Sequence, residues 1–455
     1  MKNHIQKAFY TLVAALLFCS SLIAEEEIFV RLETEAQLIP ILICPIQEAS
    51  SDLPQSHLAT LSSIFRSDMS HNGMTKISPL KELAATYAGF DLNDDYETLK
   101  NVEVFYLIKM KIEGKNLITK VISINGKSVK LIDGISLTGD VSQDRKTIHL
   151  LADTIFEVLF QKKGISSHRI VFTVREKKEG AQSPPDWQSS LYESDSDGAN
   201  LKKLALDSSY CVTPLFAKLA NDPTCASYIW VAYKNGQPKI YYAPIKDGKA
   251  RRLTPLRGNQ VTPGVSLDGT KIAFSCDTMG SADLFLVGFH PHQGSLGKPH
   301  QIFTWKGTTA ASPTFSPDGN QIAFVANMDG TPKIYIMEIP ADGSTSKDLH
   351  PTLISKRCRE NSSPAWSPDG KKIAYSAKTG SWRQIWIWDS ETGQERQLTD
   401  GPAHKENPAW APDSLHLVFN AQKGNSSELY LINLNQKESI KISSGDGEKR
   451  FPYWK

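Results

Sequence analysis

The chain has 455 residues, of which 40% are hydrophobic and 22% are charged. Its 51 basic and 49 acidic residues leave a formal net charge of +2. This balance argues against a general nucleic-acid binder, which would carry a basic excess.

The first 24 residues have the pattern of a secretory signal peptide. Lys2 and Lys7 precede an apolar run over residues 8–18, and small residues end the segment at Ala24. The apolar run is too short to span a membrane, and no later segment is long and apolar enough to do so. Cleavage after Ala24 is expected, and a lipoprotein signal with Cys19 as the lipidated residue is the alternative. The mature chain would hold 49 basic residues, two fewer than the precursor, and 49 acidic residues.

Residues 25–165 are expected to form a separate α/β sandwich, because about 140 residues suffice for an independent core. Residues 37–45 are an apolar run typical of a buried strand, and residues 58–71 have helical spacing of apolar side chains. Residues 102–112 alternate between apolar and polar and lead into a second strand, which predicts a hairpin. Residues 145–161 again show helical spacing.

A four-residue phrase recurs through the second half of the chain. It occurs as Ser266-Leu267-Asp268-Gly269, Ser316-Pro317-Asp318-Gly319, Ser367-Pro368-Asp369-Gly370 and, degraded, Ala411-Pro412-Asp413-Ser414. Proline, aspartate and glycine in this order are turn chemistry, and each phrase is followed by a run of the Ile-Ala-Phe type that suits a strand. Self-similarity at a period of about 40–50 residues is the signature of a β-propeller.

Residues 166–455 are expected to form six blades closed by the C-terminus. Second strands are predicted around Ile170, Ile229, Ile272, Ile322, Ile373 and Leu417. First strands, marked by a proline, are displaced by one blade: Pro214, Pro263, Pro313, Pro364, Pro408 and Pro452. The first blade therefore lacks its first strand, and the C-terminal Phe451-Pro452-Tyr453-Trp454 is expected to supply it. Closure of this kind removes open sheet edges.

Cysteine, histidine and acidic patterns give little sign of chemistry. The mature chain has five cysteines without metal-type spacing, and we expect buried thiols, with a Cys211–Cys225 disulfide as the alternative in an exported protein. Residues 195–200 resemble the start of a calcium loop, but Leu206 stands where its glutamate would be, which favours a turn. His290-Pro291-His292 could ligate a metal, but it lies in a polar loop. His149 is expected to be structural. No metal site, cofactor or catalytic residue is predicted.

The two domains together resemble the TolB family, the periplasmic proteins of the Tol–Pal cell-envelope system. The resemblance rests on the blade phrase, the C-terminal Pro-x-Trp, and the interdomain segment in which Arg145, His149 and Asp153 precede Gly164 and Arg169. It implies a periplasmic, monomeric, non-enzymatic binding protein. This protein would link the peptidoglycan-associated lipoprotein Pal to TolA of the inner membrane and support outer-membrane integrity, transport and cell division. An exported propeller hydrolase or a small-ligand receptor is the alternative, although no Gly-x-Ser-x-Gly motif occurs.

Residues just before the first-strand prolines are predicted to form loops on one propeller face. Short polar loops suit a protein-binding rim, and the resemblance implies that they hold the Pal-like lipoprotein. The predicted residues are Asn259, Gln260, Thr262, Ala311, Ser312, Asn361, Ser363, His404, Glu406, Asn407 and Arg450.

The mature N-terminal segment is predicted to bind the TolA-like partner. Ile28, Val30 and Leu32 alternate with polar residues after the acidic run that begins at Glu25. Such a segment can pair with a sheet edge of another chain. An ordinary first strand of the domain is the alternative.

Overall fold

The computed structural model describes residues 38–91, 95–178, 187–234, 236–340, 350–436 and 438–455. Residues 37–455 form one compact unit. The predicted signal peptide, Cys19 and the predicted TolA-binding segment lie outside the described residues.

The N-terminal domain is a mixed sheet in the order β3-β1-β4-β5-β6, with β2 also paired to β4. Its strands are β1 (Ile39–Ile43), β2 (Gln47–Ser51), β3 (Thr75–Ile77), β4 (Tyr106–Gly114), β5 (Asn116–Ser123) and β6 (Ser128–Ser136). Its helices are α2 (Gln55–His71), α3 (Lys81–Thr86), α4 (Tyr96–Asn101) and α5 (Val141–Phe160). The predicted α/β sandwich, the helix ending at residue 71 and the β4–β5 hairpin are confirmed.

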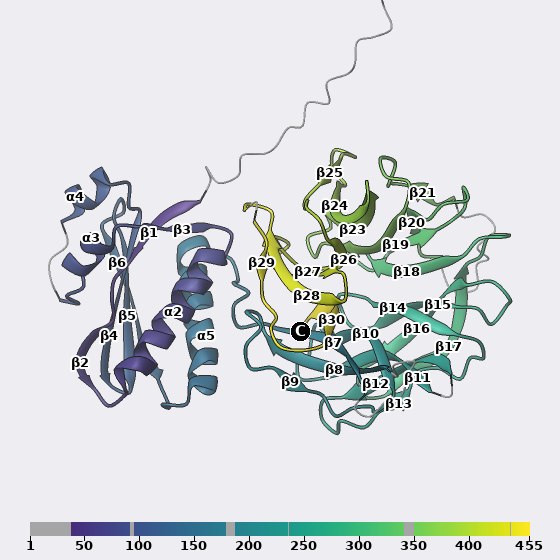
Figure 1. Ribbon diagram of the computed structural model, residues 1–455, viewed down its shortest axis with the longest axis horizontal. Coiled ribbons are helices and arrows are strands. Elements are labelled where there is room, and N and C mark those ends of the chain that lie inside the picture. Colours follow the sequence, from purple (N-terminus) through teal and green to yellow (C-terminus); the bar gives the residue numbers. More distant parts are fainter. Residues whose placement is uncertain (1–37, 92–94, 179–186, 235, 341–349, 437) are drawn as a thin grey trace, which may run out of the picture. The chain divides into compact units, whose positions relative to one another are not determined.

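Successive side chains along each strand point to opposite faces of the sheet, so each face has a hydrophobic core of its own. Ile41 and Ile43 pack with α2 and α5, whereas Leu42 and Leu107 pack with residues of α3 and α4 on the other face. Figure 1 shows the two helix pairs on opposite sides of the sheet.

Helix α5 begins four residues before the predicted start at Arg145. The Asp140 side chain accepts a hydrogen bond from the Gln143 amide (2.9 Å), which caps the first turn. Asp144 in that turn is buried and accepts from Thr138, Gly139 and His57. The helix therefore starts at its capping aspartate, which apolar spacing alone does not reveal.

The propeller has six four-stranded blades, as predicted. Blades one to three are β30 (Glu448–Trp454), β7 (Arg169–Lys177), β8 (Trp187–Asp195), β9 (Lys202–Lys203); β10 (Tyr210–Lys218), β11 (Ala226–Lys234), β12 (Gln237–Pro244), β13 (Arg251–Arg252); and β14 (Gln260–Val265), β15 (Lys271–Cys276), β16 (Asp283–His290), β17 (Gly294–Phe303). Blades four to six are β18 (Ala310–Phe315), β19 (Gln321–Ala326), β20 (Lys333–Glu338), β21 (Thr352–Leu353); β22 (Asn361–Trp366), β23 (Lys372–Thr379), β24 (Trp382–Asp389), β25 (Glu395–Gln397); and β26 (His404–Trp410), β27 (His416–Lys423), β28 (Ser426–Asn433), β29 (Ile440–Lys441).

The recurring phrase forms the turn between the first and second strands of a blade. In the fourth blade the Ser316 hydroxyl donates to Asp318 (2.5 Å) and accepts from the Gln321 amide (2.9 Å), while Gly319 has a φ of 69°. In the degraded sixth phrase, Ser414 takes the glycine position at φ 57°, and its hydroxyl accepts from the Asp369 amide (3.0 Å). This contact joins the turn of the sixth blade to that of the fifth.

Strand β30 pairs antiparallel with β7 and completes the first blade, which confirms closure by the C-terminus. The five described cysteines are buried, as expected. Cys211 pairs with Ala232, near the end of β11, whereas Cys225 precedes the start of that strand. The two thiols therefore lie near opposite ends of the strand pair, so the alternative disulfide is wrong.

Candidate functional site

A repeated irregularity marks the first strand of every blade. The pairing register shifts around the residue that precedes the proline. That residue has a positive φ, between 47° and 54°, in all six blades: Thr213, Thr262, Ser312, Ser363, Asn407 and Phe451. Non-glycine residues rarely adopt this conformation, and bulges re-aim side chains at rims and functional sites. The six bulges are therefore the strongest structural mark of a site.

The first strands contact one another in succession around the ring. Figure 1 shows β10, β14, β18, β26 and β30 converging on the middle of the propeller. Hydrogen bonds join the bulges of neighbouring blades: the Ser312 amide donates to Thr262 Oγ1 (3.0 Å), and the Ser363 hydroxyl donates to Asn407 Oδ1 (3.1 Å). The six bulge residues form a belt around the innermost strands, and all of them except Phe451 carry short polar side chains.

The expectation that the predicted partner-binding residues lie in loops is wrong for all but one of them. Only Asn259 lies in a loop, where its amide and side chain donate to Asp277. The others lie within first strands, because the strands begin before the bulge instead of at the proline: Gln260, Thr262, Ala311, Ser312, Asn361, Ser363, His404, Glu406, Asn407 and Arg450.

Two of the predicted residues are too buried to face a partner directly. Gln260 is 0% exposed and donates to the Leu256 carbonyl (2.8 Å). Asn361 is 1% exposed and donates to the Cys358 carbonyl (2.9 Å). Both side chains hold the connection from the preceding blade, so we assign them a positioning role.

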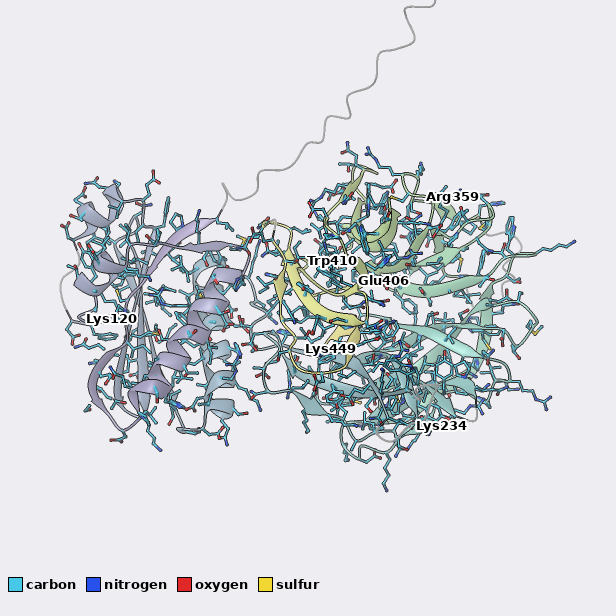
Figure 2. The ribbon with its side chains drawn as sticks, in the orientation of Figure 1. Lys120, Lys234, Arg359, Glu406, Trp410 and Lys449 are labelled. Carbon is cyan, nitrogen blue, oxygen red and sulfur yellow. The ribbon has the colours of Figure 1, made fainter. Side chains whose placement is uncertain are left out.

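Charged side chains gather beside the belt at the fifth and sixth blades. Arg383 lies 3.4 Å from Glu360 and 3.5 Å from Glu406, and the Glu406 and Lys449 side chains are labelled in Figure 2. In the first blade, Arg450 pairs with Glu448 (2.9 Å). Sequence reasoning missed Arg383, because it lies at the start of a third strand, β24, away from the residues that precede the first-strand prolines.

The belt and the N-terminal domain lie at opposite ends of the propeller. In a four-stranded meander, the turns between strands one and two and between strands three and four share one end. The N-terminal domain is hydrogen-bonded at that end: His416 to the His71 carbonyl (2.8 Å), Asn435 to the Gly73 carbonyl (2.8 Å), and Asn200 to the Ser142 carbonyl (3.1 Å). The residues before the bulges follow the connections at the other end.

An ionic network occupies the domain junction. His149 of α5 lies 2.7 Å from Asp68 of α2 and 3.8 Å from Asp197, and Arg145 also pairs with Asp197. Burial alone would lower the pKa of His149, but its hydrogen bond and charge interaction with Asp68 raise that pKa above the ordinary value. His149 is thus paired within the fold. Residues 195–200 form a turn, as predicted.

Metal-type geometry occurs once among the described residues. The group consists of His149, Asp195 and Asp197 and does not include His290 or His292. None of the helices of the described residues has the length and apolarity needed to cross a membrane.

These features define a class of protein. An α/β domain precedes a β-propeller that is closed by its own C-terminal strand, and the propeller carries a polar belt at the end away from the α/β domain. Residues 156–455 match the model of the TolB beta propeller domain. A Protein TolB homolog of Protochlamydia amoebophila is 43% identical over 400 residues, covering 86% of this chain and 85% of the relative. A homolog of Chlamydia trachomatis serovar D is 34% identical over 397 residues, covering 87% and 84%. The chain therefore belongs to the TolB family.

A solved structure has the same fold. TolB from Acinetobacter baumannii matches with a TM-score of 0.70 at 19% identity, covering 92% of this chain and 96% of that one. At this identity the match concerns the fold alone.

Proposed function

We propose that this protein is an exported, periplasmic component of a Tol–Pal system, cut from its signal peptide near Ala24. It binds a Pal-like lipoprotein at the polar belt and a TolA-like inner-membrane protein through residues 25–32. In this way it links the two membranes, supports outer-membrane integrity and cell division, and acts by binding, without catalysis. Membership of the TolB family supports the assignment of this protein to a Tol–Pal system. As part of the same proposal, residues 25–165 form one domain and residues 166–455 form the propeller.

The observation that carries the proposal is the belt of six bulges. Backbone strain of this kind costs about 1–3 kcal/mol at each residue and persists where the surroundings enforce it, commonly at binding sites. The Thr262, Ser312, Ser363 and Asn407 side chains are only partly buried. They offer hydroxyl and amide groups to a partner at the end that the N-terminal domain leaves free.

The Pal-like lipoprotein should lose affinity when the belt is blocked. Ala311 is half-buried on β18, and Ala311→Arg adds a long charged side chain beside Ser312. We expect binding to weaken by about 2 kcal/mol, roughly thirtyfold, as at central interface positions. Calorimetric titration with the soluble domain of the lipoprotein measures this change.

The matched control places the same side chain at the other end of the same blade. Asn320 is exposed in the turn between β18 and β19, where its side chain contacts Asp318. Asn320→Arg should leave affinity unchanged, and both variants should stay within about 0.5 kcal/mol of the parent in stability. Equal affinity of the parent and both variants would remove the belt from the proposal.

The TolA-like partner should no longer bind a mature chain that lacks residues 25–32. Alternating Ile28, Val30 and Leu32 can bury one face by strand pairing with another chain. Val30→Asp should weaken binding strongly, whereas Arg31→Ser on the other face should not. Titration with the periplasmic domain of the partner measures this, and Pal binding serves as a test of folding. Undiminished TolA binding by the truncated chain would make the segment an ordinary strand or tail.

A further inference from the structure

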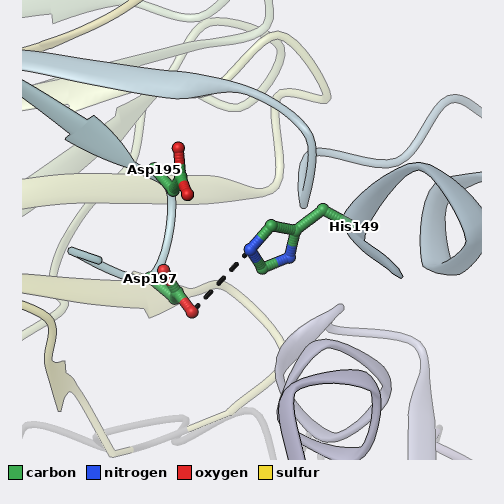
Figure 3. Close-up of side chains that lie close together, drawn as sticks. All are labelled: His149, Asp195 and Asp197. Carbon is green, nitrogen blue, oxygen red and sulfur yellow. Dashed lines mark ion pairs between the residues drawn. The ribbon is translucent and has the colours of Figure 1, made fainter. Parts of the chain in front are cut away.

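Among the described residues, one ring nitrogen of His149 finds no hydrogen-bond partner although the side chain is 1% exposed. Nδ1 is held by Asp68 at 2.7 Å. Nε2 faces Asp197 at 3.8 Å, as Figure 3 shows. Because Asp68 holds Nδ1, Nε2 is the ring nitrogen that is left for another ligand. Asp197, whose side chain is 24% exposed and also pairs with Arg145, lies on the side of the ring that Nε2 faces.

A second carboxylate completes the arrangement. Asp195 is 4% exposed, and its carboxylate, that of Asp197 and a ring nitrogen of His149 lie within 4.8 Å of one another. Figure 3 shows both aspartates at the end of β8 and in the turn after it, beside the imidazole from α5. The aspartates are also held by hydrogen bonds, from Asn200 to Asp195 (2.6 Å) and from the Ala199 amide to Asp197 (3.1 Å).

We propose that His149 Nε2, Asp195 and Asp197 bind a divalent transition-metal ion of the zinc type. An imidazole with two carboxylates suits zinc, whereas calcium and magnesium prefer oxygen ligands alone. Metal-bound histidines typically donate their other nitrogen to a carboxylate, which is the position of Asp68. Zinc bonds of about 2.0–2.2 Å require the three groups to approach by roughly 1 Å, and water completes the shell.

Two arginines already contact these carboxylates. Arg145 pairs with Asp197, and Arg169 lies 3.6 Å from Asp195. Arg145 contacts Asp197 Oδ2, the oxygen that also lies 3.8 Å from Nε2, and ligating carboxylates commonly keep such outer hydrogen bonds. Because α5 supplies the histidine and the first blade supplies the aspartates, the metal ion would tie the N-terminal domain to the propeller. This role is independent of partner binding.

The test is a Zn²⁺ titration of the chelator-treated mature chain by calorimetry. We expect one site that is lost in Asp197→Asn and in His149→Asn, and that is weakened about 10–100-fold in Asp68→Asn. The matched control is His57→Asn: His57 is also buried and lies 2.8 Å from one aspartate, Asp144, but belongs to no metal-type group. Zn²⁺ should bind this variant as it binds the parent and should raise the Tm of both.

Asp197→Asn keeps the test meaningful if His149→Asn fails to fold, because the Asp197 side chain is 24% exposed in a turn. Co²⁺ in place of Zn²⁺ should give visible absorption bands that Asp197→Asn abolishes. Equal Zn²⁺ stoichiometry and affinity in the parent, Asp197→Asn and His57→Asn would overturn the proposal. So would imidazole resonances showing that His149 carries two protons at neutral pH and does not respond to Zn²⁺, because a proton would then occupy Nε2.

Discussion

Deleting residues 448–455 should abolish the cooperative unfolding transition of the propeller. Strand β30 supplies the first strand of the first blade, and β7 has no other partner on that side. Each buried backbone group left unpaired costs about 1–3 kcal/mol, and loss of a buried tryptophan such as Trp454 costs about 3–5 kcal/mol. These losses together are comparable with the stability of a typical domain, about 5–15 kcal/mol. Thermal unfolding followed by circular dichroism and calorimetry measures the result.

Lys455→Ala distinguishes the strand from its terminal side chain. Lys455 Nζ lies 2.9 Å from Glu193 and 2.6 Å from the Tyr228 hydroxyl. Burial alone would raise the pKa of Glu193, but hydrogen bonds from Tyr228 and Lys455 lower it. Lys455→Ala removes this ion pair and keeps every backbone pair of β30, so it should lower Tm while retaining one transition. A deletion variant that melts as the parent does would contradict closure by β30.

The architecture could be predicted because its signals are local and repeated. Proline, aspartate and glycine specify the same turn wherever the phrase occurs, and counting strands by type required a closing strand at Trp454. The start of α5 was missed because a capping residue, Asp140, and not an apolar position determines it. Local chemistry therefore predicted the elements better than their ends.

The site was harder to predict because its geometry contradicts a local preference. A residue before proline normally adopts an extended conformation, so the pre-proline positions gave no reason to expect six left-handed residues. The partner-binding list omitted Thr213 and Phe451, which occupy the same position in the second and first blades. A rule that took the pre-proline residue of every first strand would have found both.

The domain junction was not predicted because its partners are far apart in the sequence. His149, Asp68 and Asp197 come from α5, α2 and the turn after β8, and no periodicity connects them. The role of a buried imidazole can be assigned only when the neighbours of both ring nitrogens are known. The sequence could therefore identify His149 as structural but could not show what lies beside its second nitrogen.

Gly198→Ala should lower the free energy of unfolding by more than the strain of the left-handed turn conformation alone. Gly198 has a φ of 85°, and its amide closes a turn by donating a hydrogen bond to the Asp195 carbonyl (2.9 Å). A Cβ there would lie 1.4 Å from the carbonyl oxygen of Ile442, in the sixth blade. Since that oxygen belongs to the backbone, the clash can be relieved only by moving the first blade away from the sixth, at the seam that β30 closes.

Gly330→Ala is the matched control for this substitution. Gly330 has a φ of 82°, and its amide donates to the Asn327 carbonyl (2.9 Å), but no atom of the described residues lies within 4 Å of its Cβ position. We expect the left-handed conformation to cost about 1–2 kcal/mol in both variants. Gly198→Ala should lose about 1–3 kcal/mol more through overpacking. Urea unfolding of the mature chain measures both, and equal losses would show that the seam between the first and sixth blades is loose enough to admit a methyl group.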